Sequence, residues 1–445
     1  MAQRVVRSAL VVLVCVLTHS RASAGPAVTP TFTKDIAPIF QAKCESCHRP
    51  NSIAPMSLVN WEDVRPWARS VRTRVAARQM PPWHIDKSVG IQHFKNDRSL
   101  NDQEIDTIVA WVAAGAPKGD PKDMPPPITW PDELAWNFVS TYGPPDLIIK
   151  SPAYTQKGDA QDAWYKPLVP TGLTESRWVR AIEIRPSTVK GRRITHHALA
   201  RLQQDEAKDA ATNDDDDAAG GAGLFMEWAV GKQGEVMRPN SGKLMLPGSK
   251  ILFDIHYHAV GEDITDSVEL AIYFYPKGQE PKYRQTLGLF HAINGGSRGL
   301  DIPPNTLTTH QGVFVMKKAG RIENFQPHMH LRGKGMMMEA ILPSGQTQVL
   351  SLVSNYQFNW HNNYIYADDV APLLPKGTVL RFTSWHDNTK NNPDNPDPTQ
   401  WVGWGDRTVD EMAHAWVNIT YLSDEDFRFE TEKRKGAAST TVEQR

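Results

Sequence analysis

The strongest constraint on the fold is a change of pattern at residues 120–127, where Met124-Pro125-Pro126-Pro127 stand together. Clustered prolines separate structural elements. Before them, apolar residues recur at helical spacing; after them, short apolar segments alternate with turns rich in Gly, Pro, Asn and Asp. The 445 residues suffice for two or three domains. We predict a small all-α domain at residues 25–120, a Pro-rich linker and lead-in at 121–164, and a body of all-β sandwiches.

Local signals place individual elements. Asn101 is a helix-capping residue type, and Glu104 three positions later completes a capping box for a helix at 101–114. Gly115 is suited to end that helix. Further helices are predicted at 32–48 and 57–77, and strands at 178–184, 251–257, 268–275, 379–384 and 414–421.

The first 24 residues have the pattern of a signal peptide. Arg4 and Arg7 precede a short apolar run, and Ala22-Ser23-Ala24 forms a cleavage site. We expect a periplasmic or secreted protein after cleavage near Ala24. No later apolar run is long enough to span a bilayer, so no transmembrane segment is expected in the mature chain. The absence of a basic stripe argues against nucleic acid as a partner.

Cys44-Glu45-Ser46-Cys47-His48 is the attachment signature of c-type haem. In it, two thiols form thioethers to the haem and the adjacent imidazole ligates iron. A redox dithiol would need a βαβ context, and a zinc site would need a second Cys/His pair nearby. Cys15, the third cysteine, would leave with the signal peptide. The sequence therefore predicts covalently bound haem c on Cys44, Cys47 and His48.

The sixth ligand of the haem iron should lie in the same region. Met80, in Arg78-Gln79-Met80-Pro81-Pro82, is the first choice, because the following prolines keep its loop extended. Met56 and His84 are the alternatives, and Met80 as a core residue is the simplest competing interpretation.

A second set of ligand residues lies in the β-rich part. His328-Met329-His330 places two imidazoles on one face of a strand, with Met329 directed to the core. Because imidazole and thioether together suit copper, the set favours copper over zinc. Adjacent His196 and His197 can bind one ion only if the strand bulges there. The full set is His196, His197, His256 (with His258 nearby), His328, His330 and Met412.

The order of these motifs resembles a known family. His-His, then His-Tyr at a strand end, then His-x-His, then Asp-Glu-Met is similar to the type II copper, ascorbate-dependent monooxygenases, which include peptidylglycine α-hydroxylating monooxygenase and dopamine β-monooxygenase. The resemblance covers about residues 165–425. The stretch from Gly405 to Met412 and the Asn/Pro-rich 388–398 resemble a bacterial branch that carries a cytochrome c domain in front.

The resemblance implies two jelly-roll-like β-sandwich domains, residues 165–285 and 286–425, before a disordered tail at 426–445. It implies two mononuclear coppers that face each other across an open cleft. Copper on His196, His197 and His256 would transfer electrons. Copper on His328, His330 and Met412, the catalytic set, would bind O2.

The chain departs from the animal members of the family in several ways. It has no cysteines for their disulfides, and their substrate-binding residues have no secure counterpart here. His258, His386 and His414 are extra histidines, each a ligand, a supporting residue or a surface residue.

We expect an exported oxidoreductase that hydroxylates a C–H bond of a small-molecule or peptide-like substrate with O2. Electrons would pass from an external donor through the haem to the two coppers. Two alternatives remain open at this stage. One is a periplasmic electron-transfer or copper-binding protein without oxygenase activity. The other is a protein whose histidines hold zinc, or nothing, and whose β-domain binds a ligand such as a glycan.

Overall fold

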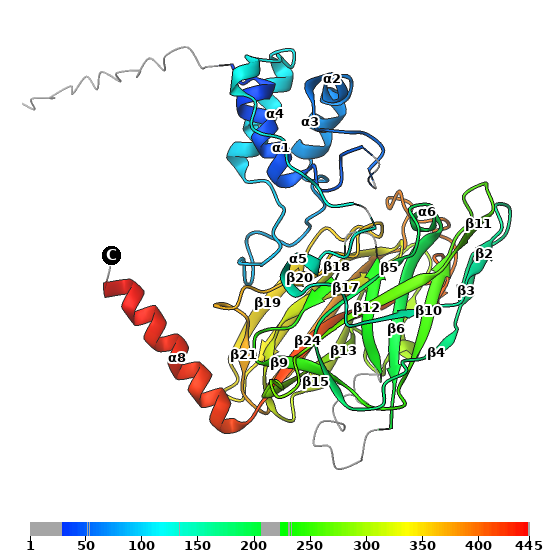
Figure 1. Cartoon of the computed structure of the whole chain (residues 1–445), viewed down its shortest axis with the longest axis vertical. Coiled ribbons are helices and arrows are strands. Elements are labelled where there is room, and N and C mark those ends of the chain that lie inside the picture. Colours follow the sequence, from blue (N-terminus) through cyan, green and yellow to red (C-terminus); the bar gives the residue numbers. More distant parts are fainter. Residues whose placement is uncertain are drawn as a thin grey trace, which may run out of the picture.

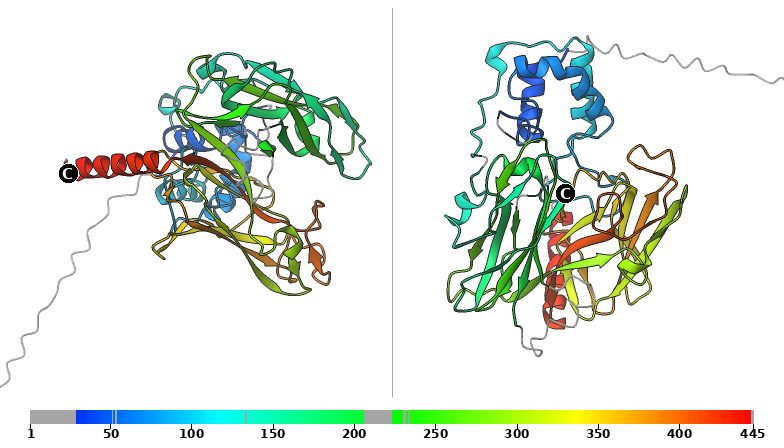
Figure 2. Two further views of the ribbon diagram at one scale, coloured as in Figure 1. Left: turned by 90° about the horizontal axis from the view of Figure 1, so that it is seen from below. Right: turned by 90° about the vertical axis from the view of Figure 1, so that its right-hand side faces the viewer.

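A computed structural model describes residues 29–443 except 51, 53, 133, 206–222, 230–231 and 233. The predicted signal peptide lies outside the described residues. Figure 1 shows a helical region packed against one end of a larger β-rich body. Figure 2 shows the two β lobes from two further directions, and in its right-hand view both lie below the helices. No helix in the described part is long and apolar enough to cross a membrane.

The helical region has its own apolar core, which includes Phe32, Phe40, Ile108 and Trp111. Its best-defined helix is capped as predicted: the Asn101 side chain accepts from the Glu104 amide, and the Glu104 carboxylate accepts from the Asn101 amide. The elements are η1 (Phe32–Ile36), α1 (Ala37–Lys43), α2 (Trp61–Val64), η2 (Arg65–Trp67), α3 (Ala68–Ala76), α4 (Asp102–Ala113), η3 (Pro121–Asp123) and α5 (Val139–Tyr142).

Two expected helices differ in extent. The one predicted at 32–48 ends at Lys43, and Cys44 to His48 form turns. The one predicted at 57–77 begins at Trp61, because the Asn60 side chain accepts from the Asp63 amide and caps it there.

Part of the predicted helical domain belongs to the β-rich body instead. Trp83, Ile85 and Phe94 join the core of the C-terminal lobe, and the Trp83 ring lies 4.8 Å from Tyr364. Ile85 also forms an isolated β-bridge with Val353. The segment between α3 and α4 thereby fastens the helical region to this lobe.

The N-terminal lobe is a β-sandwich. One face contains β1 (Leu147–Lys150), β12 (Val268–Phe274), β5 (Arg177–Pro186), β8 (Gly234–Val236) and β9 (Ser241–Met245). The other contains β3 (Ala163–Tyr165), β4 (Leu168–Pro170), β10 (Lys250–Tyr257), β6 (Thr195–Gln203) and β7 (Leu224–Ala229). Residues of both faces share one core. A small ribbon of β2 (Tyr154–Gln156) and β11 (Ile264–Asp266), with helix α6 (Gly191–Ile194), lies at one end.

The C-terminal lobe repeats this layering. Its first face contains β13 (Tyr283–His291), β24 (Ala413–Leu422), β16 (Ala319–Ile322), β17 (Asn324–Met329), β20 (Tyr364–Ile365) and β21 (Leu373–Leu374). Its second contains β15 (Leu307–Val315), β22 (Val379–Asp387), β18 (Gly333–Ile341) and β19 (Thr347–Val353). The remaining elements are η4 (Ser297–Gly299), β14 (Asp301–Ile302) and β23 (Val402–Gly403).

One sheet runs through both lobes. Parallel pairing of Tyr283 with Ser241, and of Arg284 with Gly242, joins β13 to β9. The sheet that contains β9 in the N-terminal lobe and the sheet that contains β13 in the C-terminal lobe are therefore two parts of a single 11-stranded sheet. This fixes the lobes relative to each other more firmly than a linker would.

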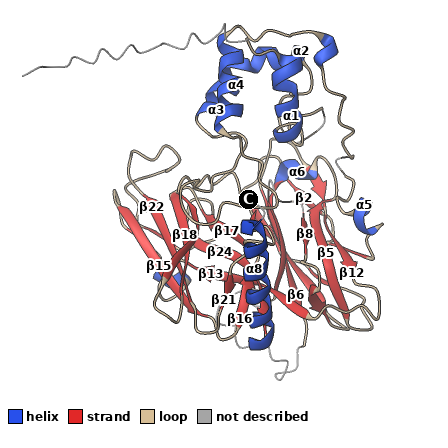
Figure 3. Cartoon of the chain, turned by 90° about the vertical axis from the view of Figure 1, so that its left-hand side faces the viewer, coloured by secondary structure: helices blue, strands red, loops and turns tan. Residues whose placement is uncertain are grey.

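The tail expected to be disordered at 426–445 is helical instead as far as residue 443, the last that the structure describes. Helix α8 (Asp424–Glu443) begins where the Ser423 hydroxyl accepts from the Asp426 amide, a helix-capping bond that the tail's composition did not suggest. α8 stands in front of the β lobes in Figure 3, and Figure 1 shows that it projects away from them, apart from the helical region.

Candidate metal centre and the adjoining cavity

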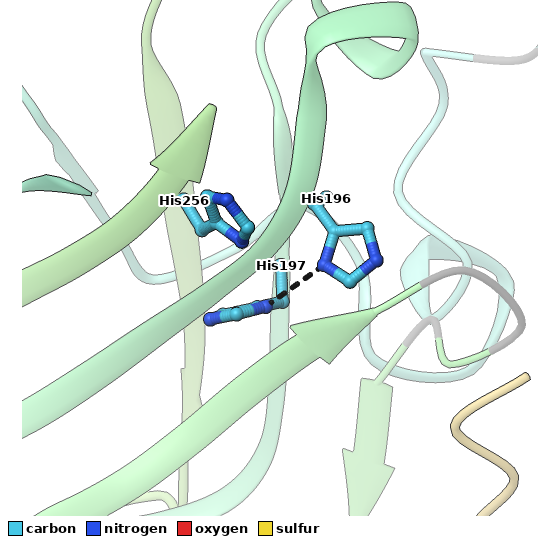
Figure 4. A group of neighbouring side chains, drawn as sticks. All are labelled: His196, His197 and His256. Atoms are coloured by element: carbon cyan, nitrogen blue, oxygen red, sulfur yellow. Dashed lines mark hydrogen bonds between the residues drawn. The ribbon is translucent and has the colours of Figure 1, made fainter. Parts of the chain in front are cut away.

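His196, His197 and His256 come together at the end of two paired strands, β6 and β10. His256 pairs with His197 and Tyr257 pairs with Thr195, so His196 is the extra residue of a β-bulge. The bulge that binding by both adjacent histidines requires is therefore present. The Nδ1 atoms of His196 and His197 are 3.1 Å apart, and ligand atoms of all three histidines lie within 4.8 Å of one another (Figure 4).

His256 is held by residues of the lead-in segment. Its Nε2 lies 2.8 Å from an Asp162 carboxylate oxygen, and its ring stacks on Trp164 at 4.6 Å. Its Nδ1 is buried without a hydrogen-bond partner. A carboxylate on one imidazole nitrogen leaves the other available, the usual support for a metal-binding histidine. The three residues therefore fit a metal ion.

The protonation state of this cluster also suits a metal. Burial, and then the charge of His256, lowers the pKa of His196 to about 4. Burial lowers the pKa of His197 well below its usual range as well. Neutral imidazole is the form that binds a metal, so both residues are ready to bind one at neutral pH.

The second set lies in the C-terminal lobe. His328 pairs with His414 and Met329 pairs with Ala413 between β17 and β24, so this ladder ends one residue short of His330 and Met412. The rings of His328 and His330 are 5.3 Å apart, and both residues are buried. Met329 is fully buried in the core of the C-terminal lobe, as predicted.

His330 has its own support. Its Nδ1 lies 3.1 Å from the Asp410 carbonyl oxygen, so Nδ1–H donates there and Nε2 stays free. The buried Glu411 carboxylate accepts from the backbone amides of His330, Arg332 and Met412. Burial raises the pKa of Glu411 to about 7. This carboxyl group ties the His-x-His segment to the segment that carries Met412.

The second set is gathered less tightly than the first. Among the described residues, His196, His197 and His256 are the one group of three His, Cys, Asp or Glu ligands within 4.8 Å. His328 instead pairs with His361, whose Nδ1 lies 3.0 Å from its own Nδ1. Sequence reasoning missed His361, since a lone histidine in a polar loop carries no periodic signal.

The extra histidines occupy distinct places. His414 is buried 4.8 Å from the His328 ring, with neither ring nitrogen hydrogen-bonded. The Nε2 of His386 lies 3.4 Å from the Met412 carbonyl oxygen. The His258 ring is 6.4 Å from His196.

The two sets are neighbours. Phe358 stacks on His196 at 5.3 Å and lies 5.7 Å from the His330 ring. The His361 ring is 6.0 Å from His196 and 4.7 Å from His328. The space between the two sets, expected as an open cleft, is therefore occupied at this level by Phe358 and His361.

A cavity of about 1100 Å³ lies between the helical region and the β body. Such a volume is at the upper end of the range for small-molecule and cofactor pockets. Cys44, Cys47 and His48 line it from the helical side, whereas His196 and His258 line it from the β side. Both cysteine thiols are free.

The polar side chains that line the cavity are suited to bind a haem. The Nδ1 of His48 lies 3.2 Å from the Met56 carbonyl oxygen, which leaves Nε2 free to ligate iron. Four arginines also line its walls, Arg74, Arg98, Arg192 and Arg193, of which Arg74 is hydrogen-bonded to Gln79 and Arg193 is paired with Glu262.

Met80, Met56 and His84 all line the same cavity. The backbone amide of His84 donates to the Tyr364 hydroxyl, and its Nε2 is buried without a partner. The three therefore remain alternative sixth ligands.

No family model and no curated protein matches the chain. Solved structures with partial similarity include the major capsid protein P2 of bacteriophage PM2, at 10% identity over 62% of this chain and 98% of that chain, with a TM-score of 0.26. Another is the infectious bursal disease virus Gx strain structure (11%, 66% and 75%, TM-score 0.16). A third is a Paenibacillus xanthan lyase (8%, 67% and 28%, TM-score 0.15). These TM-scores are too low to assign a shared fold.

Proposed function

We propose that this chain is an exported monooxygenase that contains copper and haem c and hydroxylates a C–H bond of an organic substrate. The observation that carries the proposal is the position of His196. This residue belongs to the three-histidine cluster and also lines the cavity that holds Cys44, Cys47 and His48. His196 would thus adjoin both a metal held by the cluster and a haem held in the cavity.

The reaction consumes O2, two electrons and two protons, and converts a C–H bond into C–OH with release of water. Bound copper would supply the O2 chemistry, and bound haem c would supply electrons one at a time. The external donor, of unspecified chemistry, must deliver both electrons. The N-terminal helical region is, in this proposal, a cytochrome c domain, and the two lobes are the jelly-roll-like halves implied by the family resemblance.

The residues of the chain prepare both sites. Asp162 and the Asp410 carbonyl each hold one nitrogen of a histidine and leave the other free. Phe358 covers His196 and adjoins His330, which limits water between the two sets. The segment at residues 83–94, packed on the C-terminal lobe, keeps the cavity in place. This arrangement exceeds what a flexible tether would provide, which is an effective concentration of about 1 mM.

The first experiment is a joint assay of copper and haem in protein matured with its signal peptide intact. Two coppers per haem, with one lost in Met412→Ala and the other in His256→Ala, are expected. O2-dependent oxidation of a small reductant should accompany full copper loading. Haem without copper after loading would contradict the proposal. Two coppers without any O2 consumption would favour the alternative, an electron-transfer protein.

A further inference from the structure

His361 is a buried histidine outside the proposed metal sets, and its ring nitrogen lies within hydrogen-bond distance of His328. It lies in the segment between β19 and β20 and is 3% exposed. The segment is fixed from two sides: the Gln326 amide lies 3.5 Å from the His361 carbonyl oxygen, and Asn362 donates to the Pro82 carbonyl oxygen at 2.9 Å. The imidazole is therefore held in a defined place.

The contact with His328 joins two imidazole nitrogens. Their Nδ1 atoms are 3.0 Å apart, which is hydrogen-bond distance, so one carries a proton and the other is bare. If His328 donates, its Nε2 is bare and can bind a metal. If His361 donates, the proton of His328 sits on Nε2 and blocks that atom.

The other candidate histidines of this chain lead us to expect that His328, and not His361, donates this hydrogen bond. His330 gives Nδ1–H to the Asp410 carbonyl, His256 has Nε2 on the Asp162 carboxylate, and His48 has Nδ1 on the Met56 carbonyl. In each case a protein acceptor takes one nitrogen and leaves the other free, which fixes the tautomer of a metal-binding imidazole. Among the described residues, no carbonyl or carboxylate oxygen is hydrogen-bonded to the His328 ring, and the Nδ1 of His361 lies where such an acceptor would be.

We propose that His361 is a positioning residue of the second metal set: its Nδ1 accepts the Nδ1–H of His328 and so directs the Nε2 of His328 to the metal. This inference rests on the proposed function, because it presumes a copper on His328, His330 and Met412. Support for a metal-binding histidine by another imidazole is a weaker constraint than support by a carboxylate, since imidazole has two tautomers.

Two amide variants separate this role from direct ligation. In His361→Asn the side-chain oxygen takes the place of Nδ1, and it can still accept from His328. In His361→Gln the amide extends to the place of Nε2, and the acceptor at Nδ1 is lost. Both variants keep a polar side chain of similar bulk, whereas His361→Ala leaves a buried void and serves as the full deletion.

The measurement is the dissociation constant of each copper, obtained by competition with a chelator, together with nitrogen hyperfine coupling in the cupric protein. We expect His361→Gln and His361→Ala to weaken the second site about 10- to 100-fold, and His361→Asn to restore it to within a few-fold. The first site, on His196, His197 and His256, should be unchanged in all three. Thermal unfolding of the metal-free proteins checks that each variant folds.

Two results would overturn the role of His361 alone. Equal loss in the Asn, Gln and Ala variants, with one fewer nitrogen coupled, would make it a ligand. No loss in the Gln or Ala variants would make it a packing residue. A parent protein with a single copper, unchanged by Met412→Ala, would instead refute the proposed function, and the inference about His361 with it.

Discussion

The ring of Phe358, from the C-terminal lobe, stacks on His196 of the N-terminal lobe at 5.3 Å with planes 24° apart. This contact covers one side of the three-histidine cluster and closes the gap toward His330.

Phe358→Ala should open this gap. We expect the free energy of unfolding to fall by about 2 kcal/mol, less than for a core phenylalanine because Phe358 is half-buried. In loaded protein, more reductant should be oxidised per product formed, since water reaches the site. Phe429→Ala, at a ring that is 63% exposed, is the matched control and should change stability by less than about 0.5 kcal/mol. Equal behaviour of the two variants would contradict a covering role.

Asp162→Ala should weaken copper binding to the three-histidine cluster about 10- to 100-fold, because His256 loses the carboxylate that orients it. Asp162→Asn retains an acceptor oxygen and should recover most of the affinity. The exposed neighbour Asp159→Ala should have no effect. Competition titration with a chelator measures all three, and an unchanged affinity in Asp162→Ala would mean that Trp164 alone positions the imidazole.

Lys232→Met should destabilise the protein by about 3–5 kcal/mol, because it leaves the buried Glu227 carboxylate without its cation and leaves Glu235 with Lys243 alone. Lys232 Nζ lies 2.6 Å from both Glu227 and Glu235, and all three side chains are nearly inaccessible. It also lies 3.3 Å from the Gln326 side chain of the other lobe. Urea denaturation measures the change.

The matched control for Lys232 is Lys277→Met, which breaks an exposed ion pair with Glu175. Exposed pairs contribute about 0–1 kcal/mol, so this variant should unfold almost like the parent. If the two variants lost a similar free energy of unfolding, the charges of Lys232, Glu227 and Glu235 would be well solvated, which would contradict the prediction.

His48→Ala should abolish turnover with the natural electron donor and spare turnover with a small artificial reductant, because only the first route needs the haem. His93→Ala, at an exposed histidine of the same region, is the control. The assay is O2 consumption with each reductant. Loss of both activities in folded protein that retains copper would argue against a pure relay.

The elements that depend on local signals were predictable. The Asn101–Glu104 cap, the principal strands and the burial of Met329 follow from side-chain chemistry and spacing. The bulge at His196 and His197 could be anticipated because two adjacent imidazoles cannot otherwise share one ion. Such features need only a few neighbouring residues.

Features that depend on distant residues could not be predicted. The parallel pairing of Ser241 with Tyr283 joins the lobes, and no periodicity reveals it. The insertion of Trp83 among residues of the C-terminal core spans about two-thirds of the sequence and likewise has no local signature. The contact of His361 with His328 was not predicted, because it depends on the conformation of the loop that carries His361.

The cavity has a consequence for how the protein matures. Cys44 and Cys47 line a space whose opposite wall includes His196 and Trp360 from the two lobes. Under the proposed function, a haem and the machinery that joins it to the thiols would need access before that wall is in place. The helical region emerges first during synthesis, so attachment could precede closure. The order of the chain would then set the order of loading, with haem first, the folding of the lobes second and copper last.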